Sequence, residues 1–163
     1  MSTTKPVSNG YITCDFEGHK ARGQKGSFGI DIGTKDKDPV KVYAATDCTV
    51  HITGWSETFG NRVWVKIDSG EHIGNYAIYP HLIIIDAKIH QGKKLLAGDY
   101  IGIMGNTGII MHKGKIVTNK PNAKGEFLVP MPAGRHLHYE HRTKPDTTGI
   151  SLNPLEIVNL YKK

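Results

Sequence analysis

The residues best suited to chemistry lie together in Arg135-His136-Leu137-His138-Tyr139-Glu140. In an extended strand, side chains two positions apart leave the backbone on the same face. His136 and His138 are therefore expected to look into one space, with Leu137 buried behind them. Two neighbouring imidazoles suit a metal site, where one ring binds the ion and the other handles protons. The chain has nine histidines, so the H-x-H pair alone is weak evidence, and a solvated histidine pair is the alternative.

A second informative stretch is Ser27-Phe28-Gly29-Ile30-Asp31-Ile32-Gly33. Its apolar side chains alternate into a core, which leaves Ser27, Gly29 and Asp31 on the opposite face. Four residues of straight strand would separate the side chains of residues 27 and 31 by about 13 Å. Both can reach one ion only if the chain bends, and Gly29 is a natural position for a bulge.

The elements that must position these residues are predicted to be strands. Short apolar runs alternate with Gly, Asn, Asp and Pro, a pattern typical of an all-β domain. Pro80 cannot donate to a sheet ladder, so the strand expected over 75–82 should lie at an edge or end there. Residues 83–90 fit a short helix or a strand, and 111–134 form a long polar loop, either a groove wall or a mobile segment. Asn153 is expected to cap a C-terminal helix that begins at Pro154.

Composition indicates one globular domain with a substantial core, since 38% of the 163 residues are hydrophobic and 22% are charged. No apolar run is long enough to span a bilayer, and the first residues do not resemble a secretory signal. The protein is expected to act where it is made or to leave by a route that reads no signal. The net charge of +6 fits an anionic partner, but no motif for nucleic acid accompanies it. Cys14 and Cys48 are read as buried thiols in preference to a disulfide.

Several short motifs occur in the order found in the lysostaphin/LytM-type zinc metallopeptidases, which the chain resembles over roughly residues 27–160. They are Gly29-Ile30-Asp31-Ile32, Val42-Tyr43-Ala44-Ala45, Gly60-Asn61-Arg62-Val63, Tyr79-Pro80-His81-Leu82, Gly98-Asp99-Tyr100-Ile101-Gly102, Gly105-Asn106-Thr107-Gly108, His136-Leu137-His138-Tyr139-Glu140 and Asn153-Pro154-Leu155. The resemblance implies a mainly antiparallel β-sheet with a groove and few short helices, of the duplicated-hybrid-motif type. Residues 1–26 would form a strand or loop segment packed on a metallopeptidase domain of residues 27–163.

The resemblance also implies one Zn²⁺ per chain and hydrolysis of the peptide crosslinks of bacterial peptidoglycan. Two of the family's three ligands map onto Asp31 and His138, and its catalytic histidines map onto His81 and His136. Three protein ligands would leave a fourth zinc position for water, whose pKa falls towards 7. The first family ligand, a histidine, is replaced by Ser27, whose neutral hydroxyl is a poor zinc ligand.

Three explanations of this replacement stay open. Another histidine, His19 or His112, replaces the missing ligand; or water fills the position and zinc binds weakly; or the site is inactive. If the site is active, the protein is expected to be a bacteriophage lysin or a virion-carried wall enzyme. It would reach the wall from the virion or from the host cytoplasm, and virion or tail proteins would be further partners. Inactive, it would be a structural or wall-binding module of a phage tail or of the cell-wall machinery. The remaining four histidines are expected at the surface: His51, His72, His90 and His141.

Overall fold

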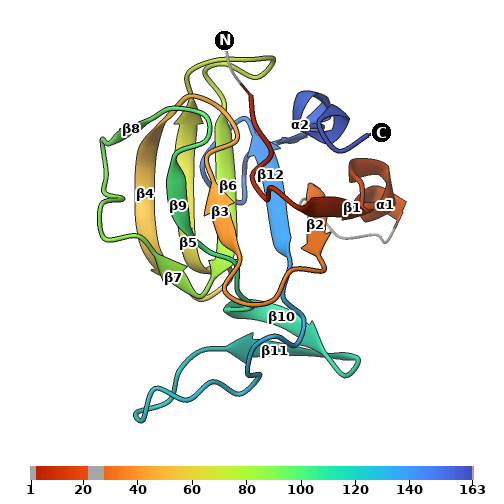
Figure 1. Cartoon of the computed structure of the whole chain (residues 1–163), viewed down its shortest axis with the longest axis vertical. Helices are drawn as coiled ribbons and strands as arrows, with labels where there is room; N and C mark the ends of the chain where they lie inside the picture. Colours follow the sequence, from red (N-terminus) through yellow and green to blue (C-terminus); the bar gives the residue numbers. More distant parts are fainter. Residues whose placement is uncertain (1–2, 22–27, 163) are drawn as a thin grey trace.

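The main sheet is antiparallel and runs across the whole molecule (Figure 1). The structure is a computed structural model that describes residues 3–21 and 28–162. Eight strands form this sheet, and β13 (Ser151–Leu152) pairs only with β12. The order of the others is β1 (Gly10–Cys14), β2 (Ile30–Thr34), β12 (Leu137–Arg142), β6 (Tyr76–Leu82), β5 (Gly60–Ile67), β4 (Cys48–Ser56) and β8 (Lys94–Leu95). The prediction of an all-β fold is confirmed.

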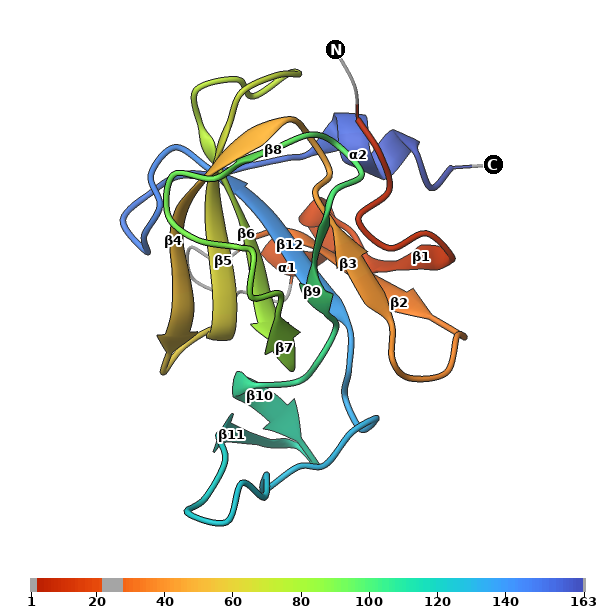
Figure 2. The ribbon, with the colours of Figure 1, turned by 60° about the vertical axis from the view of Figure 1, so that its left-hand side comes forward.

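A smaller sheet lies over one face of the main sheet, so the core forms between two layers (Figures 1 and 2). Its strands are β3 (Lys41–Tyr43), β9 (Tyr100–Ile103) and β7 (Ile84–Ile85). Val63 and Val65 of β5 alternate into this core, where they join Val42 and Ile101 of the smaller sheet. Trp64 lies between them on the opposite face, in a small cluster with Phe59 and Ile78. β5 thus places Val63 and Val65 in the core between the sheets and Trp64 on the other face.

The prediction that the strand containing Pro80 lies at an edge or ends there is wrong, because β6 lies between β12 and β5 and continues to Leu82. Pairing with β12 ends at Ile78, opposite Glu140. Pro80 lies beyond this pairing, so its missing N–H does not interrupt the hydrogen bonds to β12. On the other side, the ladder with β5 is irregular between Val63 and Asn61. His81 follows with a positive φ of 59°, which turns its side chain out of the regular alternation.

The polar stretch 111–134 is more ordered than a loop. β10 (Gly108–His112) and β11 (Lys115–Asn119) form a hairpin that projects from the end of the main sheet (Figure 2). Two buried asparagines bind the segment that leads from the hairpin back to the main sheet. The amide of Asn119 donates to the carbonyl oxygens of Asn106 and Val129, and that of Asn106 donates to those of Val129 and Ala133. These bonds fix the approach to the strand that carries the histidine pair.

Within residues 3–21 and 28–162, the fold includes two short helices, α1 (Phe16–Ala21) and α2 (Leu155–Asn159). The expected cap of α2 is corrected, since Pro154 is the N-cap residue and no side chain caps the helix. Residues 83–90 contain only the two-residue β7. Cys14 and Cys48 are both thiols and form no disulfide with each other. Among the described residues, no helix is long and apolar enough to cross a membrane.

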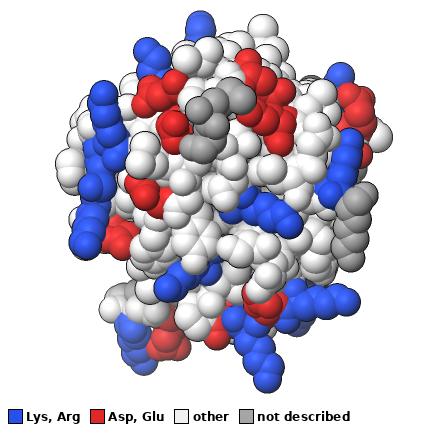
Figure 3. Space-filling model, turned by 45° about the horizontal axis from the view of Figure 1, so that its top comes forward, with Lys and Arg blue, Asp and Glu red and all other residues white. Residues whose placement is uncertain are grey.

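Charged side chains are spread over the surface. On the face shown in Figure 3, lysines and arginines are interspersed with aspartates and glutamates, without a large patch of one sign. The net charge of +6 is therefore not concentrated on that face. Such a surface supplies a diffuse attraction to anions and gives no sign of a nucleic-acid groove there.

Candidate metal centre

Cys14, Asp31 and His138 lie in one row across three neighbouring strands. In the ladders, Asp31 of β2 is paired with Cys14 of β1 on one side and with His138 of β12 on the other. Directly opposed residues of antiparallel strands project from the same face of the sheet. An irregularity in β1 between Ile12 and Cys14 brings the thiol into this row. The sheet register thus places these three side chains next to one another.

His138 is held between two carboxylates. Its Nδ1 lies 2.8 Å from Oδ1 of Asp31, and its Nε2 lies 3.2 Å from Oε2 of Glu140. Burial would lower the pKa of His138, but the hydrogen bonds with Asp31 and Glu140 outweigh it and raise this pKa to about 9. Glu140 is buried and also accepts hydrogen bonds from Arg142. With no metal, His138 is therefore an imidazolium, with Nδ1–H directed at Asp31 and Nε2–H directed at Glu140.

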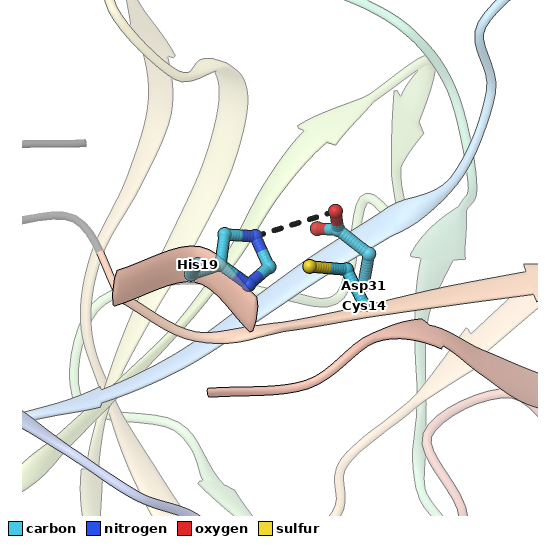
Figure 4. A group of neighbouring side chains, drawn as sticks. All are labelled: Cys14, His19 and Asp31. Carbon is cyan, nitrogen blue, oxygen red and sulfur yellow. Dashed lines mark ion pairs between the residues drawn. The ribbon is translucent and has the colours of Figure 1, made fainter. Parts of the chain in front are cut away.

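His19 reaches the same carboxylate from α1, directly after β1 (Figure 4). Its Nε2 lies 3.3 Å from Oδ2 of Asp31, and the side chain is only 1% exposed. Its Nδ1–H donates to the carbonyl oxygen of Asp15, 2.9 Å away, so Nε2 is the nitrogen that faces Asp31. Phe16 of the same helix packs edge-to-face on Phe28 and holds the helix against the strand that leads to Asp31. The rings of His19 and His138 are in edge-to-face contact, with centroids 4.9 Å apart.

Asp31 is the centre of the cluster. Burial would raise the pKa of its carboxyl, but hydrogen bonds with His138 and His19 prevail and hold this pKa far below its ordinary range. The thiol of Cys14 completes a compact group with His19 and Asp31, whose ligand atoms all lie within 4.8 Å of one another. Figure 4 shows the three side chains converging on one point from β1, α1 and β2. Two nitrogens, a carboxylate and a thiol are ligands that zinc accepts.

His136 stands at the open side of the site. Its Nδ1–H donates to the carbonyl oxygen of Gly134, 2.9 Å away, and its Nε2 lies 3.7 Å from Oδ1 of Asp31. Its side chain is 37% exposed, so the ring is open to water and ligands. Arg135, directly before it, forms an ion pair with Asp38 and donates to the carbonyl oxygen of Asp36, which anchors the start of β12.

His81 is fixed by its neighbour Thr107. Its Nδ1–H donates to the carbonyl oxygen of Thr107, 2.5 Å away. The Thr107 hydroxyl in turn donates to the carbonyl oxygen of Leu82 and accepts from the backbone N–H of Asn61. Burial lowers the pKa of His81 to about 4, with His138 and His136 as further causes. The ring is therefore neutral near pH 7, with a lone pair on Nε2.

The residues predicted from sequence are distributed as follows. The structure brings Asp31, His138, His136 and His19 together, whereas Ser27 lies outside the described residues. His112 ends β10 in the projecting hairpin. Sequence reasoning missed two members, Cys14 and Glu140. Glu140 is two residues beyond His138 on the same strand face, and this spacing was a signal that could have identified it.

The chain is similar to known proteins both in its sequence and in its fold. The profile of peptidase family M23 matches residues 25–154. A putative glycyl-glycine endopeptidase LytM from Ruminococcus gnavus is 27% identical, with a TM-score of 0.63 over 92% of this chain and 54% of its own. The prophage-encoded M23 protein EnpA from Enterococcus faecalis, as a catalytic-domain mutant, is 25% identical, with a TM-score of 0.57 and 90% of both chains covered.

SpoIIQ in its complex with SpoIIIAH is a further structural neighbour, 22% identical, with a TM-score of 0.59 over 95% of this chain and 99% of the other. A comparison with curated proteins by sequence finds no match. The chain spans about half the length of the first solved structures that it resembles, 51% and 54%. M23 peptidases are zinc-dependent, in keeping with the donor atoms around Asp31. Because the family profile covers most of its length, this chain belongs to peptidase family M23.

Proposed function

We propose that this protein is a zinc-dependent endopeptidase that cleaves peptide crosslinks of bacterial peptidoglycan, with His19 as the ligand that replaces the family's first histidine. The observation that carries the proposal is the convergence of His19 Nε2 and His138 Nδ1 on the two oxygens of Asp31, at 3.3 and 2.8 Å. Two histidines and a carboxylate form the three-ligand set of a catalytic zinc site with one open position.

The surroundings of each ligand support this assignment. The His19 Nδ1–H donates to a carbonyl oxygen, and the His138 Nε2–H donates to the Glu140 carboxylate. Histidines that ligate metals usually donate their second N–H in this way, which fixes the tautomer and orients the ring. The proton on His138 Nδ1 marks a cation position beside Asp31 that the metal would take over. When bound there, zinc would polarise a peptide carbonyl and acidify a water molecule.

His136 and His81 are the groups that handle protons and orient reactants. Each donates its Nδ1–H to a carbonyl oxygen, so in the neutral ring Nε2 is the acceptor. We assign the proton-accepting role to His136, because the imidazolium that it becomes lies 3.7 Å from the Asp31 carboxylate. His81 resists protonation, since burial lowers its pKa to about 4. Its Nε2 would accept a hydrogen bond from the attacking water and orient it.

The resemblance to EnpA, which is prophage-encoded, supports a setting in a bacteriophage. We propose a lysin or a virion-associated wall enzyme, with peptidoglycan as its substrate and virion or tail proteins as further partners. Its basic net charge would favour association with an anionic wall. The R. gnavus relative, described as a glycyl-glycine endopeptidase, makes glycine bridges the first crosslink to test.

A second candidate function follows from Cys14. Its thiol lies within 4.8 Å of ligand atoms of His19 and Asp31. If the thiolate became a fourth protein ligand, zinc would be closed to water, as in structural sites. The domain would then be a catalytically silent module that binds wall material or a protein partner. Cys14→Ser separates the two functions: an enzyme would keep its zinc and its activity, whereas a closed site would lose zinc affinity.

Digestion of purified peptidoglycan tests the proposal. The zinc-loaded protein should release new amino termini from at least one of several crosslink types, including glycine-bridged walls. A chelator should abolish release, and added zinc should restore it, because the metal is needed for hydrolysis. Zinc bound at the Asp31 centre without release from any wall type would contradict the enzyme and favour the silent module.

A further inference from the structure

A second histidine cluster lies on the other side of β12. His141 is three residues beyond His138, so its side chain leaves the strand from the opposite face. It was expected at the surface, but it is 1% exposed. Its Nδ1 lies 2.6 Å from Nδ1 of His72, which belongs to the loop between β5 and β6. The rings meet edge-to-face, with centroids 4.9 Å apart. Glu71 Oε1 lies 4.0 Å from the same His72 nitrogen.

Nε2 of His141 is held by buried Tyr139. The Tyr139 hydroxyl lies 2.6 Å from Nε2 of His141. The ring of Tyr139 packs on that of Tyr79, with centroids 5.2 Å apart, and the Tyr79 hydroxyl oxygen accepts from the backbone N–H of Ala45. With Tyr139 as the acceptor of Nε2–H, the lone pair of His141 is on Nδ1, directed at His72. A buried imidazole with one N–H anchored and the other nitrogen directed at a second imidazole has the orientation of a metal ligand.

Protonation of the pair is compatible with a metal. Burial, together with His72, lowers the pKa of His141 to about 3, so this ring is neutral at physiological pH. Neutral imidazole is the form that binds transition metals. Without a metal, one proton between the two Nδ1 atoms satisfies both rings. A metal would replace that proton and leave every other hydrogen bond of His141 in place.

A carboxylate is available as third ligand. Glu71 is tied to the start of α2 by reciprocal bonds: its N–H donates to the Glu156 carboxylate, and the Glu156 N–H donates to Glu71 Oε1, each at 2.9 Å. The second oxygen of Glu71 is not used in these bonds. Two imidazoles and one carboxylate form a zinc-type donor set.

We propose that Glu71, His72 and His141 form a second metal site, for Zn²⁺ or a similar divalent transition metal, that ties the β5–β6 loop and α2 to β12. Two nitrogens around a tetrahedral zinc lie about 3.3 Å apart, so the rings must separate by about 0.7 Å on binding. His141 is fixed within the sheet, whereas His72 is partly exposed in a turn flanked by Gly70 and Gly74, both at positive φ. The adjustment therefore falls on His72. The role is structural, because this site and the Asp31 centre lie on opposite faces of β12.

The test isolates this site from the catalytic centre by using Asp31→Asn as background. In that background, titration with zinc against a competing chelator should give one zinc per chain, and the further change His72→Ala should weaken its binding at least 100-fold. Saturating zinc should raise the Tm by about 5 °C or more, and His72→Ala should remove the rise. His90→Ala, which removes an exposed histidine, is the matched control and should change neither quantity.

Equal zinc affinity and an equal Tm rise with and without His72 would overturn the proposal. His72→Ala is preferred to a change at buried His141, because His72 is a partly exposed loop residue whose removal costs less in folding. The Tm of each metal-free variant verifies this. The outcome is independent of the peptidase proposal: His72→Ala in the otherwise natural chain should hydrolyse peptidoglycan at the natural rate, whether or not the second site binds zinc.

Discussion

Asp31→Asn is expected to abolish hydrolysis and to weaken zinc binding at the catalytic centre at least 100-fold. Both Asp31 oxygens face histidine nitrogens, at 2.8 and 3.3 Å, and His136 lies 3.7 Å from the first of them. The amide has nearly the same shape but lacks the negative charge, and it presents an NH₂ group to one of these nitrogens. Loss of a ligand should exceed the 10- to 100-fold effects of residues behind the ligands.

Competition with a chelator of known affinity measures the zinc affinity, and release of amino termini from peptidoglycan measures the activity. The background for both is His72→Ala, so that only the catalytic centre binds zinc. Glu17→Gln is the control, because it removes an exposed carboxylate from the helix that carries His19. Natural zinc affinity in Asp31→Asn would place the metal elsewhere in the chain.

His136→Ala is expected to lower the rate of hydrolysis by about 10²- to 10⁴-fold while leaving the zinc content unchanged. This range is typical for the loss of a general acid or base. The side chain is 37% exposed and contributes little to the core, so the fold should persist. The measurement is the hydrolysis rate at saturating substrate, together with zinc per chain in the same sample.

His81→Asn should likewise lower the rate of hydrolysis while leaving the zinc content unchanged. Asparagine is chosen because His81 has a φ of 59°, a conformation that asparagine tolerates better than most residues. His90→Ala is the histidine control for both variants. A fall in zinc content parallel to the fall in rate would show that these histidines hold the metal, and would contradict the roles assigned to them.

The fold and half of the site follow from local sequence patterns. Alternation in 61–67 predicts a half-buried strand, and the H-x-H spacing places His136 and His138 on one face. The pairing of Asp31 with His138 depends on sheet register, which no local pattern contains; the family resemblance supplied it. The position of the strand that contains Pro80 was predicted wrongly because it too depends on sheet pairing. A proline signals a missing donor, but whether a neighbour needs that donor depends on where the pairing ends.

The other residues became visible only in three dimensions. Cys14 enters the row through an irregularity in β1, which shifts the alternation on which strand reading depends. His19 was one of two candidate ligands, and its selection depends on a six-residue helix that folds back over Asp31. His141 was placed at the surface because histidine is usually exposed. Its burial depends on the loop that carries His72, which is distant in sequence.

The zinc affinity of His19→Ala, measured in the His72→Ala background, tests the central claim most directly. The claim is that a histidine from α1 replaces the ligand missing at position 27. The account predicts one zinc per chain in the background protein and a loss of affinity of at least 100-fold when His19 is removed, with no comparable loss in His112→Ala. Unchanged affinity in His19→Ala would show that Asp31 and His138 bind the metal without it, and would contradict the account.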